Sequence, residues 1–369
     1  MSAAGSIENL TIKGFKSIAD LDRFPLSRLN VLIGANGAGK SNFVSYFRMV
    51  SEMSEKRLQN WTQQKGGAER ILSFGIKETP RVESLVEFGS NGYQFILEPT
   101  VDGGFLLAQE KLFVRQPDNG SGWKQLGSGI RESALKDSLK DTVLSTAAQS
   151  CYDAITGWKV FHFHDTSDTA SVKRWGALHD NQHLSSDASN LAAYLYRLRE
   201  EHPDVYEEIR KTARLAIPFF DDFVLQPRKL QSGEEQIQLL WRQKDSAYSL
   251  WPSQLSDGSI RFICLTTALL KPDPPSTIII DEPELGLHPY AIVLLGALLR
   301  SASHRMQIVV STQSTSLVNE FAIRNLIVVE QQNGKSIFNR PDEQEFASWL
   351  EAYALGELWE KNVLGGRPG

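Results

Sequence analysis

The sequence predicts an α/β fold whose parallel sheet is assembled from both ends of the chain, with an antiparallel β layer and an inserted, mainly helical arm. The first observation is an apolar run at residues 29–33, followed by a glycine-rich loop and then helix-compatible residues from Ser41 to Met49. The second is the alternation of helical segments and apolar strands from Gly258 onward, which is typical of a parallel sheet. The third is the alternation of apolar and polar residues over 82–97, which indicates antiparallel strands with one buried face.

Composition limits the class of protein. The chain has 369 residues, 39 Lys and Arg against 44 Asp and Glu, and 41% hydrophobic residues, so it can bury a sizeable core. It has two cysteines, too few for a disulfide framework, which favours the cytoplasm. We see no apolar run of membrane-spanning length and no signal peptide, so we expect no membrane association. The mild acidity argues against bulk binding of nucleic acid but leaves a local basic patch open.

The first part of the chain is expected to consist mostly of strands. An Asn91–Gly92 pair lies between two alternating runs and predicts a hairpin turn. The expected strands are 7–15, 21–26, 29–33, 82–88, 93–97 and 105–115.

The middle and the end of the chain are expected to contain more helix. Sustained heptads are absent between the glycine loop and Leu255, so no long inserted coiled coil is expected. The expected helices are 130–149, 189–199, one from Pro203, 258–270, 291–300 and 317–321, and the expected strands are 158–163, 223–230, 236–242, 277–281, 307–311 and 325–330. These elements suggest an N-terminal lobe at 1–115, an inserted arm at 116–222 and a C-terminal lobe at 223–369.

The glycine-rich loop predicts a phosphate site. A strand, a glycine loop and a helix start place several backbone N–H groups and the positive end of a helix in one small volume, which suits a polyphosphate. Lys40 would reach the β- and γ-phosphates, and the Ser41 hydroxyl would bind Mg²⁺. The predicted loop residues are Gly34, Ala35, Asn36, Gly37, Ala38, Gly39, Lys40, Ser41 and Asn42.

Two adjacent carboxylates follow the apolar strand 277–280. They lie at its carboxyl end, where open α/β sheets bind ligands. Asp281 would join Ser41 in holding Mg²⁺, and Glu282 would polarise the attacking water of a phosphoryl transfer. A strand that simply ends in an acidic turn is the alternative, and the phosphate loop favours the functional interpretation.

A weaker phosphate motif precedes the helix at 258–270. Ser256 and Gly258 combine a hydroxyl, a small turn and a helix N-terminus. One chain needs no second γ-phosphate site for the same nucleotide, but a dimer does if each chain offers this segment to its partner. The alternative is that Ser256 is only an N-cap.

The ordered set GANGAGKS (34–41), LSDGS (255–259), TIIIDEPELGLHP (277–289) and VVSTQS (309–314) resembles the ABC-type ATPase head, a P-loop NTPase. It resembles the SMC/RecF/OLD branch more than a transporter subunit, because the first strand of that branch often reads like residues 10–18. Residues 161–167, 190–193 and 355–368 are similar to a family of predicted bacterial AAA-type ATPases found in defence or mobile-element operons.

The resemblance implies roles for single residues. Gly34 to Ser41 would be Walker A, Asp281 and Glu282 would be Walker B with the catalytic glutamate, Ser256 and Gly258 the signature, and residues 284–288 the D-loop. Two departures stand out. Asp257 replaces the usual glycine of a transporter signature, and Gln313 replaces the switch histidine. Because glutamine can donate a hydrogen bond but carries no proton charge, slow turnover is an open interpretation.

Some polar groups remain ambiguous. No convincing Q-loop glutamine is present, and His164 and Asp165 are the candidate stand-ins. Both also belong to a crowd of possible ligands that is either a metal site or, as we expect from its non-zinc spacing, a polar loop near the nucleotide: His162, His164, Asp165, Asp168, His179, Asp180 and His183. Basic residues at 210–214 and 228–229 fit a solvated face, or else a DNA track along the arm.

The resemblance implies an ATP-binding and ATP-hydrolysing dimer of the RecF/OLD type, with ATP and Mg²⁺ as cofactors and possible higher oligomers. Because the printed sequence ends soon after Gly366, we expect a separate effector chain, such as a nuclease, in bacterial anti-phage defence. The first alternative is a DNA-repair or DNA-end-binding ATPase that acts directly on nucleic acid. A transporter nucleotide-binding subunit and a non-catalytic scaffold are the others, and the arm and Glu282 argue against them.

Overall fold

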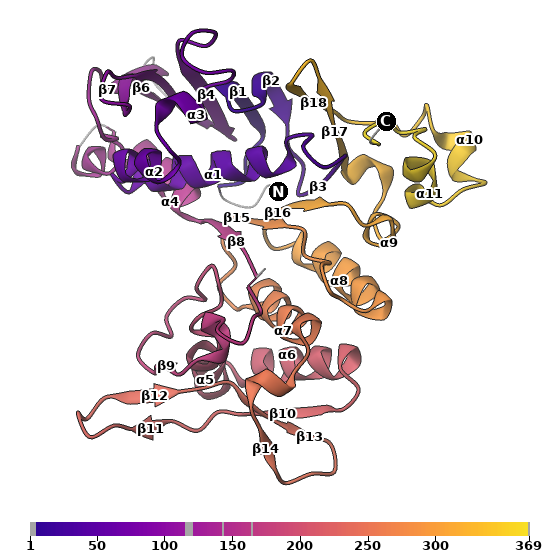
Figure 1. The fold of residues 1–369 in the computed structure, drawn as a ribbon. Coiled ribbons are helices and arrows are strands. Elements are labelled where there is room, and N and C mark those ends of the chain that lie inside the picture. Colours follow the sequence, from indigo (N-terminus) through magenta and orange to yellow (C-terminus); the bar gives the residue numbers. More distant parts are fainter. Residues whose placement is uncertain (1–4, 115–120, 142–143, 164, 368–369) are drawn as a thin grey trace.

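A computed structural model describes residues 5–114, 121–141, 144–163 and 165–367. It consists of an upper part with two six-stranded sheets and a lower part of helices and short strands (Figure 1). The predicted fold class is confirmed: a parallel sheet, an antiparallel layer and an arm-like lower part are all present.

The antiparallel layer is formed by consecutive strands of the N-terminal segment. Its strand order is β2-β1-β4-β5-β6-β7, and every pairing in it is antiparallel. Its buried face alternates along the chain, as in β4, where Val82, Ser84, Val86 and Phe88 are all buried. The strands are β1 (Asn9–Phe15), β2 (Ile18–Pro25), β4 (Val82–Phe88), β5 (Asn91–Pro99), β6 (Phe105–Val114) and β7 (Gly122–Gly127).

The second sheet is the one that the sequence predicts to be built from both ends of the chain. Its order is β18-β17-β3-β16-β15-β8, with five parallel strands and an antiparallel edge strand, β18. Both faces are covered, which explains the continuous apolar runs in its central strands. The strands are β3 (Leu29–Ile33), β8 (Trp158–Phe161), β15 (Thr277–Asp281), β16 (Gln307–Thr312), β17 (Leu326–Gln332) and β18 (Lys335–Asn339).

Helix α1 (Lys40–Ser54) lies between the two sheets. Phe43 and Phe47 share one hydrophobic core with Leu10 of the antiparallel layer and Leu32 of the parallel sheet. The remaining helices of the upper part surround this core or cover the opposite face of the parallel sheet: α2 (Leu58–Gln64), α3 (Ala68–Ile71), α4 (Ser145–Thr156), α8 (Pro289–Ala302), α9 (Thr315–Val318), α10 (Ala347–Leu350), α11 (Leu355–Glu360), η1 (Asp137–Lys140) and η4 (Ile323–Asn325).

The lower part combines helices with two small three-stranded sheets, in the orders β10-β13-β14 and β11-β12-β9. Its elements are β9 (Gly176–Ala177), α5 (Leu191–Glu201), α6 (Pro203–Ala216), β10 (Phe220–Val224), β11 (Arg228–Lys229), β12 (Glu235–Ile237), β13 (Leu240–Gln243), β14 (Ser249–Leu250), α7 (Asp257–Leu270), η2 (Ser171–Lys173) and η3 (Pro252–Gln254).

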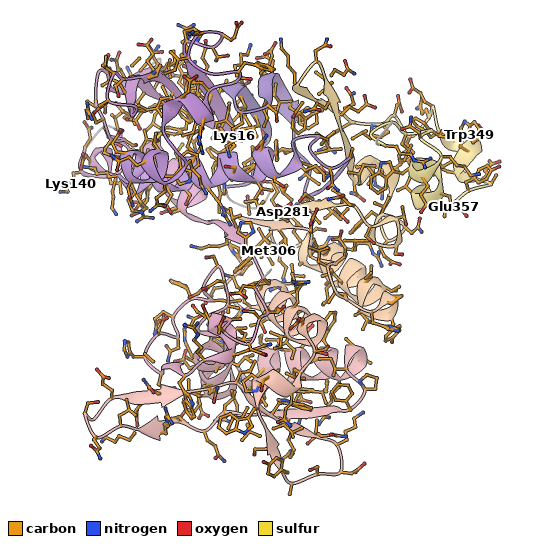
Figure 2. All side chains as sticks on the ribbon, in the orientation of Figure 1. Lys16, Lys140, Asp281, Met306, Trp349 and Glu357 are labelled. Carbon is orange, nitrogen blue, oxygen red and sulfur yellow. The ribbon has the colours of Figure 1, made fainter. Side chains whose placement is uncertain are left out.

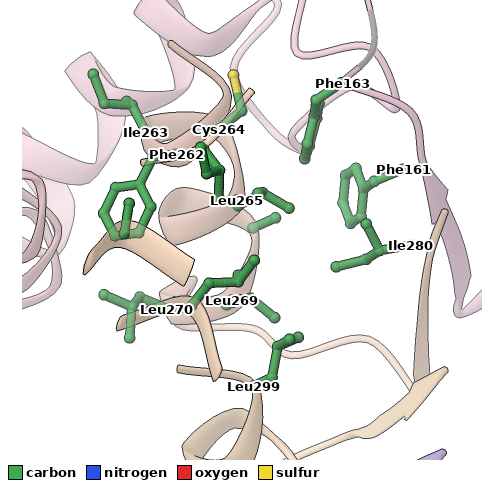
Figure 3. Close-up of a cluster of buried hydrophobic side chains, with 14 of the residues drawn as sticks. Phe161, Phe163, Phe262, Ile263, Cys264, Leu265, Leu269, Leu270, Ile280 and Leu299 are labelled. Carbon is green, nitrogen blue, oxygen red and sulfur yellow. The ribbon is translucent and has the colours of Figure 1, made fainter. Parts of the chain in front are cut away.

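Helix α7 joins the lower part to the parallel sheet. Nearly every residue from Ile260 to Leu270 is buried. Figure 3 shows side chains of α7 in the same apolar cluster as Phe161 at the end of β8 and Ile280 of β15. The start of α7 is therefore fixed relative to the sheet edge that carries the acidic pair.

The predicted hairpin is present, but its turn lies elsewhere. Residues Gly89 and Ser90 connect β4 to β5, while Asn91 and Gly92 are already paired with Phe88 and Glu87. A Cβ at Gly92 would touch the ring of Trp123. Gly92 therefore makes room for packing, and the positive φ required by the turn is at Gly89, where φ is +56°.

The helix expected over residues 130–149 is wrong. The described part of this segment contains the short η1 and then α4, which continues to Thr156, and Val143 lies outside the described residues. The buried Glu110 accepts hydrogen bonds from the Ser133 hydroxyl at 2.5 Å and the Ala134 N–H at 2.8 Å. These bonds hold the segment against the β layer, in competition with helical bonding.

The strand pair expected at 223–230 and 236–242 is divided into two pairs. Strand β10 pairs with β13, and β11 pairs with β12. Pro227 lies between β10 and β11, where a residue without an N–H interrupts a ladder. Within the range expected for the arm, β7 pairs with β6 and β8 pairs with β15, so these two strands lie in the upper sheets. The division at 115/116 and 222/223 stays a prediction.

Candidate functional site

The glycine-rich loop connects β3 to α1 as the sequence predicts. At Gly34 a Cβ would collide with the carbonyl oxygen of Val329 in the neighbouring strand β17. At Gly39, the N-cap of α1, φ is +112° and a Cβ would collide with the Ser336 hydroxyl. The loop is therefore held closely against β17 and β18, which leaves only glycine at these two positions.

Lys40 is a buried cation within this loop. Its side chain is 5% exposed, and its ammonium group donates hydrogen bonds to the carbonyl oxygens of Gly34 at 2.6 Å and Ala35 at 2.9 Å. Burial lowers the pKa of Lys40, and the nearby carboxylates of Glu282, Asp281 and Glu284 act in the opposite direction. A phosphate bound in the loop would supply the negative charge that this buried ammonium group lacks.

A hydroxyl network supports the loop, and the sequence analysis did not identify it. The Ser336 hydroxyl of β18 lies 2.6 Å from the Ala38 carbonyl and 2.7 Å from the Ser17 hydroxyl. The Asn42 side-chain amide donates to the same Ser17 hydroxyl at 2.7 Å. Residues from both ends of the chain thus fix the first turn of α1, and only their small size and hydroxyl groups could have suggested this.

The acidic pair lies at the carboxyl end of β15. Asp281 accepts a hydrogen bond from the Ser311 hydroxyl on the adjacent strand β16. Glu282 has a φ of +47°, and its N–H donates to the Ser311 carbonyl at 2.8 Å. A non-glycine residue in this conformation is strained, and such strain concentrates at functional sites.

Gln313 contacts Glu282 directly. Its side-chain amide donates a hydrogen bond to Oε1 of Glu282, and its backbone N–H donates to Glu284 at 3.2 Å. Glu284 is 7% exposed, also accepts from the Thr312 hydroxyl at 2.5 Å, and has its pKa raised by burial. Glu284 therefore anchors the backbone that carries Gln313, a role that the sequence analysis did not assign to it.

These groups line one pocket of about 150 Å³. Lys40 and Ser41 lie on its phosphate-loop side, and Glu282 and Gln313 lie opposite. Gly37, Gly39, Asn36 and Asn42 complete the lining. The structure thus brings together residues from two distant segments, as the paired motifs predict.

The oxygen ligands available here fit Mg²⁺. Ser41 offers a hydroxyl and Asp281 a carboxylate, the hard donors that this ion prefers. Asp281 is close enough to Lys40 to affect its pKa, which places the carboxylate near the phosphate loop.

The Ser256 motif lies outside this lining, as the described residues define it. Ser256 is the N-cap of α7, and its hydroxyl accepts from the Ser259 N–H at 3.1 Å. Ser256 and Asp257 are exposed, while Gly258 lies directly against the carbonyl of Gly286, so that a side chain there would clash. Both sequence interpretations of Ser256 remain open: it is an N-cap, and it is accessible to a partner.

Two buried cations next to this motif escaped the sequence analysis. Arg261 donates to the Phe163 carbonyl at 2.8 Å and also to the Leu285 carbonyl, linking α7 to the end of β8 and to the segment after the acidic pair. Lys173 is 7% exposed and lies 3.5 Å from the Asp257 carboxylate. Neither belongs to a recognisable motif.

The remaining polar candidates gain little support. His164 lies outside the described residues, and Asp165 is exposed and accepts from the Ser167 N–H and hydroxyl. Within the described ranges, no group of three or more His, Cys, Asp or Glu residues could hold a metal ion. In the same part of the chain, no helix is long and apolar enough to cross a membrane.

The basic residues of the arm are largely paired. Arg210 bonds to Glu207 and Asp222, Lys211 lies 3.7 Å from Glu207, and Arg214 bonds to Asp221. Arg228 stacks on the ring of Trp175, with 3.6 Å to its centroid. These contacts favour the solvated-face interpretation over a DNA track.

Comparison with known proteins supports the assignment of the fold. Residues 154–319 match the family model described as "AAA domain, putative AbiEii toxin, Type IV TA system". This match includes the Ser256 motif, the acidic pair and Gln313. Urease accessory protein 2 of Cryptococcus neoformans var. grubii is 27% identical over 173 residues, which are 45% of this chain and 13% of that protein.

Two solved structures resemble nearly the whole chain. An Smc head bound to the C-winged helix domain of ScpA has a TM-score of 0.57 and 16% identity, covering 93% of this chain and 99% of the other. An Smc head with an extended coiled coil, bound to the C-terminal domain of ScpA from Pyrococcus furiosus, has a TM-score of 0.53 and 15% identity, covering 94% and 98%. The chain therefore has the fold of an ABC-type ATPase head in its SMC form, which confirms the predicted resemblance.

Proposed function

We propose that this protein binds and hydrolyses ATP with Mg²⁺ and acts as a dimeric switch of the RecF/OLD type. The observation that carries this proposal is the single pocket in which Lys40 faces Glu282 and Gln313. Lys40 would neutralise the β- and γ-phosphates, and the bound ion would stabilise the charge that develops on them. Glu282 would orient the attacking water.

The dimer follows from where the Ser256 motif lies. It is exposed and outside the pocket of its own chain, so it can reach a nucleotide only on a partner. Leu285, Tyr290 and Val293 are exposed by 42%, 52% and 46%, on or just after the segment that contacts Gly258. An isologous dimer would cover this apolar surface on both chains.

The hydrogen bond between Gln313 and Glu282 supports slow turnover. Because the glutamine amide stays neutral, it orients the carboxylate without supplying a proton charge near the γ-phosphate. We therefore favour a switch whose ATP-bound dimer persists.

The dimer would control a separate partner chain, such as a nuclease, in bacterial defence. The description of the matching family as a putative toxin of a type IV TA system supports this setting. Two similar heads are bound to ScpA, which gives a precedent for a head of this fold that binds another protein. Direct action on nucleic acid remains the alternative, and the paired arginines of the arm give it no support.

Glu282→Gln tests the proposed chemistry. The variant keeps the size of the side chain but loses the carboxylate, so ATP binding should persist while the hydrolysis rate falls by about a hundredfold or more. Glu98→Gln, an exposed carboxylate on β5, is the matched control and should hydrolyse ATP like the parent. If Glu282→Gln turns over ATP at the parental rate, the proposed water-positioning role is wrong.

A further inference from the structure

A second pocket lies beside the proposed nucleotide site and shares no lining residue with it. Its volume is about 380 Å³, within the range of small-molecule sites. Residues of α1 and α2 form one wall and residues of β8 form the other, with Ser186 from the loop that leads into the lower part.

The lining of this pocket is rich in cations that lack partners. Arg48, Lys65 and Lys159 come from α1, the end of α2 and β8. In the described part of the chain, none of the three makes a side-chain hydrogen bond or an ion pair, although Arg48 is only partly exposed. The acidic side chain of the lining, Glu52, is already engaged by Arg57.

Nearby lysines experience the positive potential of this cluster. Burial, together with the neighbouring charges of Lys65 and Arg48, lowers the pKa of Lys16 to about 8. On the other side, burial and Lys159 lower the pKa of Lys271 to about 8, with Asp273 acting against the shift. Figure 2 shows Lys16 in the upper part, above Asp281.

Folded proteins seldom gather unpaired like charges around a cavity without a counter-ion, because the mutual repulsion destabilises them. Asp281 offsets only part of the charge of Arg48. The apolar remainder of the lining includes Trp61 and Trp158, so the space would hold more than a bare phosphate.

We propose that this pocket is a second anion site, which binds a phosphate group carried by a ligand other than the nucleotide of the phosphate loop. Arg48 would provide planar hydrogen-bond donors, and Lys65 and Lys159 would provide point charges. The ligand is either a free phosphorylated molecule or the phosphates of a nucleic acid strand. Its binding would connect α1 to β8, and through Arg48 it would change the charge environment of Asp281.

The test uses the full chain with Lys40→Ala, which removes the main cation of the phosphate loop, so the result does not depend on the proposed ATPase activity. Inorganic pyrophosphate and a short single-stranded oligodeoxynucleotide are titrated separately by calorimetry at low salt. We expect at least one probe to bind. Adding Arg48→Ala or Lys159→Ala should each weaken that binding by about tenfold.

Lys229→Ala, an exposed lysine on β11, is the matched control and should leave binding unchanged. Because Arg48 and Lys159 lie on opposite walls, one variant still decides if the other fails to fold, which circular dichroism detects. Pyrophosphate binding identifies a free phosphorylated ligand, and binding of the oligonucleotide alone identifies a nucleic acid strand. If neither probe binds, or if both pocket variants bind like the Lys40→Ala parent, the second site does not exist.

Discussion

Lys40 shows how one residue can be folded in advance of its ligand. Its ammonium group is buried and bonded to two loop carbonyls, so it is already positioned where a β/γ-phosphate would lie. Lys40→Ala should therefore abolish measurable ATP binding, because the charge-assisted contacts to the phosphates disappear. Calorimetric titration with ATP and Mg²⁺ measures this, with Lys77→Ala, an exposed lysine, as the control. Parental affinity in Lys40→Ala would remove the basis for the phosphate site.

Lys16 gives a prediction about pH. Its pKa is lowered from 10.5 to about 8 in the folded protein, chiefly by burial. Between these values the unfolded lysine is protonated and the folded one is neutral. The unfolded state then binds more protons, so the free energy of unfolding rises with pH across this window. The contribution of Lys16 is thus most unfavourable below pH 8.

Lys16→Met should remove this dependence. Urea denaturation at several pH values from about 7 to 10 should show the parent gaining stability relative to the variant as pH rises. Lys271 has a similarly lowered pKa and contributes equally to both proteins, so only the difference between them is informative. Lys77→Met serves as the exposed control. A constant difference across this range would show that Lys16 is not buried as a cation.

At the level of elements, two glycines of the same loop provide a matched pair. Both have positive φ, +112° at Gly39 and +80° at Gly37. A Cβ at Gly39 would collide with the hydroxyls of Ser336 and Ser17, whereas at Gly37 it would meet open space. Gly39→Ala therefore adds a steric clash to the backbone strain, which alone costs about 1–3 kcal/mol.

Thermal denaturation and ATP titration test this comparison. Gly39→Ala should lower the melting temperature and ATP affinity more than Gly37→Ala does, because displacing Ser336 also releases the Ala38 carbonyl. Equal effects from the two substitutions would mean that the hydroxyl network does not hold the loop.

The sequence predicted those elements whose signals are local. The run at 29–33, the loop and α1 follow one another directly, and the buried strands from β15 onward are continuous apolar segments. The helix expected at 130–149 failed because a contact distant in sequence, from the buried Glu110, determines the local backbone. The Asn91–Gly92 turn was misplaced because Gly92 is required by the ring of Trp123, which lies on another strand.

The candidate site divides in the same way. Motif spacing identified Lys40, Glu282 and Gln313, which line one pocket. It did not identify Ser336, which supports the loop from a strand near the other end of the chain, because a single serine carries no sequence signal. Arg48 and Lys159 were missed for the same reason: α1 and β8 are adjacent only in the folded structure.

At the level of the whole molecule, two hydrophobic cores lie on opposite faces of the parallel sheet. One contains α1 and the antiparallel layer, and the other contains α7, α8 and the lower part. The phosphate loop begins α1 and the Ser256 motif begins α7, so each lies at the start of its own helix on a different face. This separation is the structural reason to expect a site shared between two chains.

The last prediction tests sharing by complementation. Ser256 is exposed and outside the pocket that contains Lys40. Ser256→Arg should leave ATP binding by the single chain nearly intact, while the bulky charge blocks ATP-dependent dimerisation and hydrolysis. In a mixture with Lys40→Ala, one composite site is restored, because the Ser256→Arg chain supplies the phosphate loop and the Lys40→Ala chain supplies the intact Ser256 motif. Two-fold docking allows this in only one of the two sites of each mixed dimer.

The measurement is the ATPase rate across mixing ratios, with subunit exchange confirmed by labelled chains. The shared site requires a maximum at intermediate ratios, since neither parent contains both halves of a working site. A mixture of Lys40→Ala with Glu282→Gln is the control and should stay inactive, because both substitutions affect the same half, formed by the pocket of one chain. Normal hydrolysis by Ser256→Arg alone would instead mean that each chain completes its own site and that Ser256 only caps α7.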